Sequence, residues 1–287
     1  MNKIKTFTNV IFLTMTMLFF ICFNATGQDL ITGNSPVLER IISSGVIKVG
    51  VNPNFKPFSY TENGKRLGVS IEMAKLLGNM LGVKTQIEVP NSFNELIPML
   101  HTGAIDIIMA DMTKNFSRAM VINFSNSYFQ TGLTIMLNKV QAGKDKIPVV
   151  NEYGKFIEGL KKDSKEQKLC IAVTKGKSPA KSAPIFFPNS KITYYPTNEK
   201  SAEAVLSGKA HIMIHDETFL KIWFNDNKKR SLYKLVVFPK PFKKDNYAFA
   251  IQKGNQEFLN LINVFVMELK VEGYFKRFMK KYNLDMD

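Results

Sequence analysis

Two side chains of opposite charge, Arg118 and Asp216, indicate a site for a small charged molecule. A guanidinium presents a planar fork of donors that can bind a carboxylate bidentately, a geometry that a lysine lacks. Thr113, five residues before Arg118, can add a hydroxyl donor to the same carboxylate. On the residues alone, Arg118 could equally be a surface arginine in a salt bridge, and Asp216 could cap a helix.

Other kinds of reactive site find little support in the sequence. His101, His211 and His215 do not have the spacing of a metal-binding motif. A phosphate-binding glycine loop and a nucleophile elbow are both missing. Cys170 lies in an apolar, strand-like stretch, so we interpret it as a packed core thiol and not a nucleophile. We therefore expect no metal, no cofactor and no catalytic residue.

The elements around these residues alternate between strands and helices. Apolar and β-branched runs predict strands, and apolar residues at helical spacing predict helices between them. The first unit has strands at 46–51, 84–89 and 105–109, and helices at 70–81 and 93–102. The same order returns in a second unit, with strands at 169–173, 191–195 and 210–214. This alternation predicts two α/β units, each with a parallel sheet and crossover helices.

Ligands of open α/β sheets gather at the carboxyl ends of the strands. The residues at those ends are 52–55, 110–113, 174–178 and 215–216. With two units, we expect these edges to face each other across a cleft that closes by hinge motion.

The first 27 residues have the layout of a signal peptide. Lys3 and Lys5 precede an apolar run at 10–23, and Ala25 and Gly27 are the small residues of a cleavage site. An uncleaved N-terminal anchor is the alternative.

The net charge of the chain is +15, but the lysines are scattered and do not interleave with aromatic residues. We therefore expect a solvated basic surface and no nucleic-acid partner.

The order of several short motifs is similar to that of a known family. The stretch LIPMLHTGAID at 96–106 continues through Met112-Thr113, Arg118 and an FS pair to Tyr128. It resembles the pattern LIPxLxxGxxD…MTxxxxR…xFSxxY of the family 3 extracellular solute-binding proteins, the polar amino-acid receptors of ABC importers. The segment GVSIE at 68–72 looks like the family's GFDVD, with Ser70 in place of the usual first acid. The resemblance covers essentially the whole chain after the signal peptide.

This resemblance implies an α/β, two-lobed periplasmic-binding-protein fold of type II, with two crossing strands as the hinge. Lobe one would comprise 28–129 plus 245–287, and lobe two 130–244. The expected ligand is an amino acid or similar small zwitterion, and the expected partner is an ABC permease in the inner membrane. The protein would act as a monomer, in the periplasm or secreted, after cleavage near Gly27.

The resemblance also implies roles for the candidate site residues. In the family, the arginine matching Arg118 holds the ligand α-carboxylate, and the acid matching Asp216 receives the α-ammonium. Phe55 and Phe93 match aromatic residues over the ligand side chain, although either could be plain core.

Four further positions bear on the identity of the ligand. Asn52 stands where relatives that bind cationic side chains often have an acid, so it suggests a polar neutral partner. Asp111 replaces a small residue, and would disfavour an anionic ligand if its side chain faces the cleft. Lys177 and Ser178 stand where small or hydroxyl residues are common, and Ser178 could donate to the ligand carboxylate from the second lobe.

Two other functions fit the same fold. Some relatives act as periplasmic dehydratases that use cleft carboxylates as general acids, and Asp111, Asp216 and His215 would be the acid–base candidates here. A ligand-sensing module would have an identical cleft.

Overall fold

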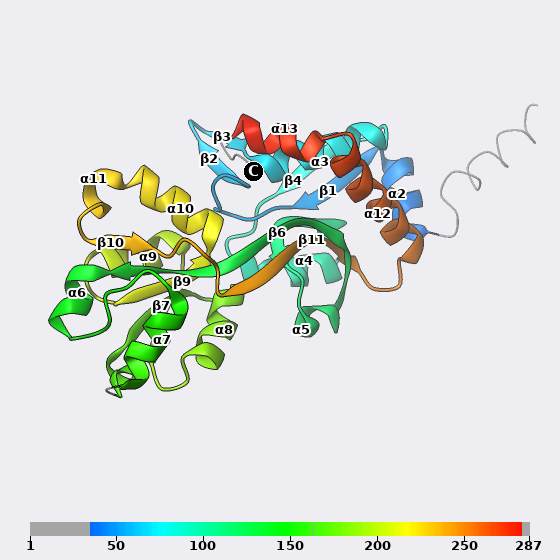
Figure 1. Cartoon of the computed structure of the whole chain (residues 1–287). Helices are drawn as coiled ribbons and strands as arrows, with labels where there is room; N and C mark the ends of the chain where they lie inside the picture. Colours follow the sequence, from blue (N-terminus) through cyan, green and yellow to red (C-terminus); the bar gives the residue numbers. More distant parts are fainter. Residues whose placement is uncertain (1–34, 163, 283–287) are drawn as a thin grey trace, which may run out of the picture.

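Two α/β lobes joined by two long strands make up the protein (Figure 1). The structure is a computed structural model that describes residues 35–162 and 164–282, so the predicted signal peptide at 1–27 lies outside the described residues. The joining strands are β6 (Ile122–Asn138) and β11 (Lys243–Gln252), which pair antiparallel with each other. Within the described ranges, no helix combines the length and hydropathy of a membrane span.

One nine-stranded sheet runs through both lobes, in the order β4-β1-β5-β11-β6-β9-β7-β8, with β10 paired to β6. The pairs around β1 and those around β7 are parallel, as predicted, whereas β6, β10 and β11 run antiparallel to their neighbours. The first lobe contains β1 (Val46–Gly50), β4 (Lys84–Glu88), β5 (Ile107–Thr113) and the hairpin β2 (Tyr60–Glu62) and β3 (Lys65–Leu67). The second contains β7 (Cys170–Thr174), β8 (Lys191–Tyr195), β9 (Ile212–Asp216) and β10 (Leu235–Val237).

Helices cover the sheet in both lobes. Those of the first lobe are α2 (Pro36–Ser44), α3 (Val69–Met80), α4 (Leu96–His101), α5 (Phe116–Ala119), α12 (Gln256–Val271) and α13 (Tyr274–Lys281). Those of the second are α6 (Lys139–Lys144), α7 (Tyr153–Lys162), α8 (Ser178–Phe186), α9 (Asn198–Leu206), α10 (Glu217–Asp226) and α11 (Lys228–Ser231). Figure 1 shows α13, near the end of the chain, lying against α3, so the first lobe is built from two distant parts of the sequence.

The predicted helices and strands are found, but two strands extend further than expected. The strand predicted over 105–109 is β5, which continues to Thr113, so Asp111 and Thr113 lie in the strand and not in a loop after it. All seven residues of β5 are buried, and Tyr247 of β11 pairs with Thr113. This pairing joins segments far apart in sequence, which explains why local periodicity placed the strand end too early. In the same way, β9 includes His215 and Asp216.

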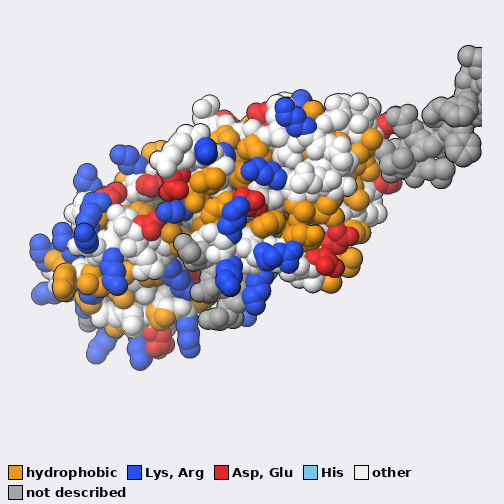
Figure 2. Space-filling model, turned by 90° about the horizontal axis from the view of Figure 1, so that it is seen from above, with side chains coloured by type: hydrophobic (Ala, Val, Ile, Leu, Met, Phe, Trp, Pro, Cys, Tyr) orange, Lys and Arg blue, Asp and Glu red, His pale blue; other side chains and the backbone are white. Residues whose placement is uncertain are grey.

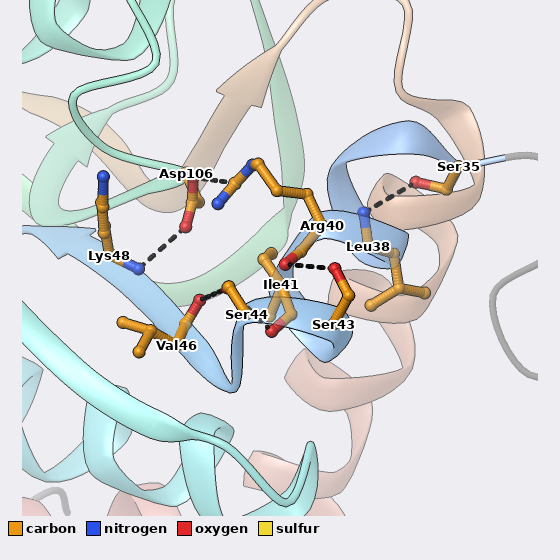
Figure 3. Close-up of polar contacts among 9 residues, drawn as sticks. All are labelled: Ser35, Leu38, Arg40, Ile41, Ser43, Ser44, Val46, Lys48 and Asp106. Carbon is orange, nitrogen blue, oxygen red and sulfur yellow. Dashed lines mark hydrogen bonds and ion pairs between the residues drawn. The ribbon is translucent and has the colours of Figure 1, made fainter.

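Asp106 fixes the start of β5 to the rest of the first lobe (Figure 3). Its Oδ2 accepts a 2.8 Å hydrogen bond from the backbone N–H of Lys48 on β1, and its Oδ1 pairs with the guanidinium of Arg40 on α2. These contacts hold α2, β1 and β5 together, and so fix where the carboxyl end of β5 lies.

Basic side chains are spread over the surface. In Figure 2 they lie as separate groups among acidic and apolar side chains, and they are most frequent at the end that carries the second lobe. The face in view therefore carries no single continuous basic stripe.

Candidate ligand-binding site

A small cavity lies between the lobes, where the carboxyl ends of β5 and β9 approach each other. Its volume is about 30 Å³, which leaves room for about one water molecule. All eight residues predicted for the site line it: Asn52, Phe55, Phe93, Asp111, Thr113, Arg118, Ser178 and Asp216. The remaining lining residues are Leu133, Lys177, Pro179, His215, Asp245 and Tyr247. The structure thus brings the eight together, and the contact of each with a ligand remains a prediction.

The lobes touch each other around this cavity. Polar contacts bridge them outside it, between Asn54 and Glu199 at 3.0 Å, Lys56 and Asp226 at 3.3 Å, and Ser117 and Lys181 at 3.0 Å. The cleft is therefore in a closed arrangement, and a molecule as large as an amino acid can enter only when the lobes separate.

Arg118 faces the cavity from α5. The Asn115 side chain caps this helix and accepts a hydrogen bond from the Arg118 N–H at 3.0 Å. Arg118 is 7% exposed; Nη1 donates to the Thr113 carbonyl at 3.0 Å, and Nη2 reaches the Gly176 carbonyl of the second lobe at 3.4 Å. Burial lowers the pKa of Arg118 to about 10, and the Asp245 carboxylate acts in the opposite direction.

The guanidinium of Arg118 forms no ion pair within 4 Å among the described residues. A buried cation without a carboxylate partner is costly, because two carbonyl hydrogen bonds and the face of Phe93 replace only part of its lost hydration. The salt bridge considered from the sequence is therefore not found, and the geometry suits an anion supplied from outside the chain.

Asp216 lies on the opposite lobe and caps a helix as well as lining the cavity. Its Oδ1 accepts from the backbone N–H groups of Thr218 and Phe219 at 2.8 and 3.3 Å, at the start of α10. Its Oδ2 accepts from the hydroxyls of Thr131 and Tyr247. Burial raises the pKa of Asp216, although these four hydrogen bonds stabilise the carboxylate. Asp216 therefore caps α10, which is one of the two roles considered from the sequence, and it also lines the cavity in which the other role, contact with a ligand, would be possible.

Asp111 has an unusual backbone and a partly satisfied side chain. Its φ of 55° lies in the left-handed region, where Asp is better tolerated than most residues. Oδ1 accepts from Ser70 Oγ at 2.9 Å and from the Tyr128 hydroxyl at 3.0 Å. Oδ2 is buried and has no hydrogen-bond partner among the residues that the structure describes. Burial raises the pKa of Asp111 to about 7, so this carboxyl titrates near neutral pH.

An aromatic compartment occupies one side of the cavity. Phe55 and Phe93 are 3% and 8% exposed, so each contributes to the core and to the cavity wall. The Lys177 ammonium enters this compartment from the second lobe, 3.7 Å from the centroid of the Phe93 ring and 5.7 Å from that of Phe55. It also donates to Asn52 Oδ1 at 3.2 Å. Burial lowers the pKa of Lys177 to about 7.

Of the other lining residues, Lys177 and His215 lie within the predicted strand ends 174–178 and 215–216, whereas Leu133, Pro179, Asp245 and Tyr247 were not predicted. Tyr247 and Asp245 come from β11, which is far away in the sequence. His215 was an acid–base candidate; its Nε2 lies 3.0 Å from Asn198 Oδ1, and burial lowers its pKa to about 3. The histidine is therefore neutral, with a buried Nδ1 that has no hydrogen-bond partner in the ranges 35–162 and 164–282.

The described residues contain no cluster of three or more His, Cys, Asp or Glu side chains that could hold a metal ion. The site is built from charged, hydroxyl and aromatic groups, which can bind a small polar molecule by hydrogen bonds and aromatic contact.

Comparison with known proteins identifies the wider group. The model of the bacterial extracellular solute-binding proteins, family 3, matches residues 47–285. The glutamine-binding protein GlnH of an ABC transporter in Bacillus subtilis is 26% identical over 249 residues, which is 85% of this chain and 84% of the relative. The cyclohexadienyl dehydratase of Pseudomonas aeruginosa is 29% identical over 181 residues, 62% of each chain.

Solved structures agree with this grouping. The ancestral amino acid-binding protein AncCDT-1, a precursor of cyclohexadienyl dehydratase, matches with a TM-score of 0.71 and 29% identity, and 85% of this chain and 98% of that one are covered. The arginine-bound form of truncated ArgBP from T. maritima matches with a TM-score of 0.67 and 26% identity, over 80% of this chain and 99% of that one.

Proposed function

Because this chain belongs to family 3 of the bacterial extracellular solute-binding proteins, we propose that its cleft captures a free amino acid, or a similar small zwitterion, for uptake through an ABC permease. One observation carries the proposal: Arg118, buried and without an ion-pair partner in the described part of the chain, shares a cavity with the buried carboxyls of Asp111 and Asp216. A zwitterion compensates charges of both signs, whereas an ion of one sign leaves the opposite group uncompensated.

The ligand binds first to the open first lobe. Arg118 takes the α-carboxylate, with the Thr113 hydroxyl beside it, and the second lobe then closes over the ligand. Only the closed form offers groups from both lobes, so the ligand shifts the open–closed equilibrium by its difference in affinity for the two forms. The permease then recognises the closed protein.

The ligand ammonium has two possible acceptors. The carboxylate of Asp216 already accepts four hydrogen bonds from the protein, whereas Asp111 Oδ2 accepts none. We therefore propose that Asp111 Oδ2 receives the ammonium directly, while Asp216 contributes its negative charge and holds α10. This assigns to Asp111 the role that the family resemblance assigns to Asp216.

A thermal-shift screen of the common amino acids tests the proposal. A ligand at a hundredfold its dissociation constant should stabilise the fold by about 2.7 kcal/mol. Arg118→Ala should abolish that shift, because the carboxylate loses its bidentate donor, and should change the melting point of the ligand-free protein little. Arg230→Ala is the matched control, since Arg230 is exposed and paired with Glu203 away from the cavity. A ligand that binds Arg118→Ala as tightly as the unmodified protein contradicts the proposal.

A dehydratase activity is the second candidate. It is supported by the likeness to the cyclohexadienyl dehydratase and by Asp111, a cavity carboxyl whose pKa is raised to about 7 and which can therefore act as a general acid. Incubation with a cyclohexadienyl acid that carries a ring hydroxyl tests this activity. Loss of the hydroxyl as water, with a ring proton or with a ring carboxyl group that leaves as carbon dioxide, gives an aromatic ring with new ultraviolet absorbance. A ligand-sensing role would use the same cleft, and a pull-down with the candidate permease distinguishes it from transport.

We further propose that cleavage near Gly27 releases a monomer into the periplasm or the medium, with lobe one at 28–129 plus 245–287 and lobe two at 130–244. N-terminal sequencing of the exported protein and light scattering after gel filtration test these statements. Retention of residues 1–27 would support the alternative of an N-terminal anchor.

A further inference from the structure

We propose that Lys177 determines which ligand side chain the cleft accepts: its ammonium excludes basic amino acids and selects one whose side chain ends in a carboxylate. This inference rests on the proposed function, because it names the class of amino acid that the cleft binds.

The loop before α8 directs Lys177 into the cavity. Gly176 has a φ of 78°, and a Cβ at this position would lie 1.8 Å from Asn94 Oδ1 of the first lobe. Glycine therefore allows the loop to approach the first lobe closely. Lys177 follows in an extended conformation as the residue before α8, and its backbone N–H donates to the Thr174 carbonyl at 3.2 Å. Its side chain consequently crosses the cleft to the aromatic compartment.

The compartment is one in which a cationic side chain would otherwise be held. Cations are attracted to aromatic faces within about 6 Å of the ring centroid. The Lys177 ammonium already occupies this position over Phe93, close to Phe55 and to the amide oxygen of Asn52. A ligand with a basic side chain would bring a second cation against the first, which disfavours it by like-charge repulsion.

The ammonium of Lys177 is also incompletely satisfied. It has three donors, and it contacts one amide oxygen and two aromatic faces. Among the described residues it forms no ion pair within 4 Å. A carboxylate on the ligand would complete this set with charge-assisted hydrogen bonds, and would favour the protonated lysine.

The charges in the cavity wall match such a ligand. Arg118 and Lys177 offer two separate positions for carboxylates. One buried carboxylate oxygen of the wall, Asp111 Oδ2, has no hydrogen-bond partner among the described residues and can receive the ammonium. An acidic amino acid supplies two carboxylates and one ammonium, so each of its charges meets an opposite charge. The sequence-based expectation that Asp111 disfavours an anionic ligand took no account of Lys177.

Isothermal titration with glutamate, glutamine and lysine tests the inference, because these amino acids have side chains of similar length and different charge. It is best done close to neutral pH, because the pKa of Lys177 and that of Asp111 both lie at about 7, and a lower pH would protonate the carboxyl that receives the ligand ammonium. The unmodified protein should bind glutamate most tightly and lysine least. Lys177→Met keeps the length of the side chain and removes its charge, and should weaken glutamate binding by roughly tenfold to a hundredfold while lysine binding is retained or improved. Lys181→Met is the matched control, because Lys181 also bridges the lobes from α8 but lies on the surface.

The outcomes separate this inference from the proposed function. If the protein prefers lysine, or if Lys177→Met keeps the same preference for glutamate over lysine, the inference is wrong and the proposed function stands. If no amino acid binds the unmodified protein, both are wrong. Lys177→Gln, a second uncharged variant that retains a polar end, should reproduce the loss if charge and not folding is responsible, and circular dichroism checks the fold of both variants.

Discussion

Replacing Asp111 with asparagine should stabilise the ligand-free protein more at about pH 8 than at about pH 5. Asparagine keeps an acceptor oxygen for Ser70 and Tyr128, and it tolerates the positive φ of this position. The variant therefore differs from the original chiefly in its inability to carry a negative charge.

The sign and size follow from the raised pKa of Asp111. This pKa is 3.8 in its ordinary environment and about 7 in the folded protein, so between these values the folded state binds more protons than the unfolded state. The stability of the original protein consequently falls as the pH rises through this window, by about 2–3 kcal/mol between about pH 5 and pH 8. Asparagine has no such loss, so the difference between the two proteins should grow by that amount.

Two other buried groups titrate in the opposite direction. His215 has its pKa lowered to about 3 and Lys177 to about 7, so the penalty that each imposes disappears as the pH rises. They mask the contribution of Asp111 in the pH profile of the whole protein. The contribution of His215 cancels when the variant is compared with the original, whereas that of Lys177 cancels only in part, because the charge of Asp111 raises the pKa of Lys177. His215→Gln provides an internal check, because it should stabilise the protein at low pH and not at high pH.

Urea denaturation at both pH values measures these differences, provided that the m-value is the same in the two proteins. A difference between Asp111→Asn and the original that does not change with pH, or that shrinks as the pH rises, would refute the reasoning. The carboxyl would then be ionised in the folded state at low pH, despite its burial.

The remaining predictions concern the first lobe, the closed form and its detection. Gly68→Ala should cost more than about 3 kcal/mol of stability by urea denaturation, because its φ is 126° and a Cβ would lie 2.1 Å from the Phe58 carbonyl oxygen. Gly82→Ala, at a φ of 68° with nothing within 4 Å, should cost only about 1 kcal/mol, and equal losses would contradict this account. Lys56→Met removes the exposed ion pair with Asp226 between the lobes. Because such pairs contribute up to about 1 kcal/mol, the population of the open form, measured by small-angle scattering, should rise at most about fivefold. A protein that is mainly open would show that this pair determines closure. Trp223, the one tryptophan, is 8% exposed on α10, so its fluorescence should change on ligand binding, and an unchanged spectrum at saturation would mean that α10 does not respond.

Local patterns in the sequence predicted the parts of the fold that depend on local packing. The helix expected over 70–81 is Val69–Met80, and the strand expected over 191–195 has those bounds, because apolar periodicity reflects burial against one neighbouring layer. The strand-end rule placed Asp111 and Thr113 at the edge of the first unit and Asp216 at the facing edge of the second, and the structure brings them to one cavity.

Non-local pairing accounts for what was not predicted. The full length of β6 could not be predicted from the sequence, because its central part carries polar residues where it crosses between the lobes. Its antiparallel partners β9, β10 and β11 are also distant in the chain. Tyr247 and Asp245 reach the site only through this pairing. Lys177 was noted as an unusual residue, but its position over Phe93 depends on closure of the lobes, which no local pattern records.

The strands that connect the lobes also form part of the cavity wall. Leu133 lies on β6, and Asp245 and Tyr247 lie on β11, so the surface beneath the ligand is the same backbone that bends when the lobes separate. The affinity for the ligand and the rate at which the lobes open then both depend on β6 and β11, so a change in either strand should alter both. A substitution that stiffens either strand should slow both the release and the capture of the ligand. Evolution of tighter ligand binding in this protein would therefore reduce the rate of uptake through the importer.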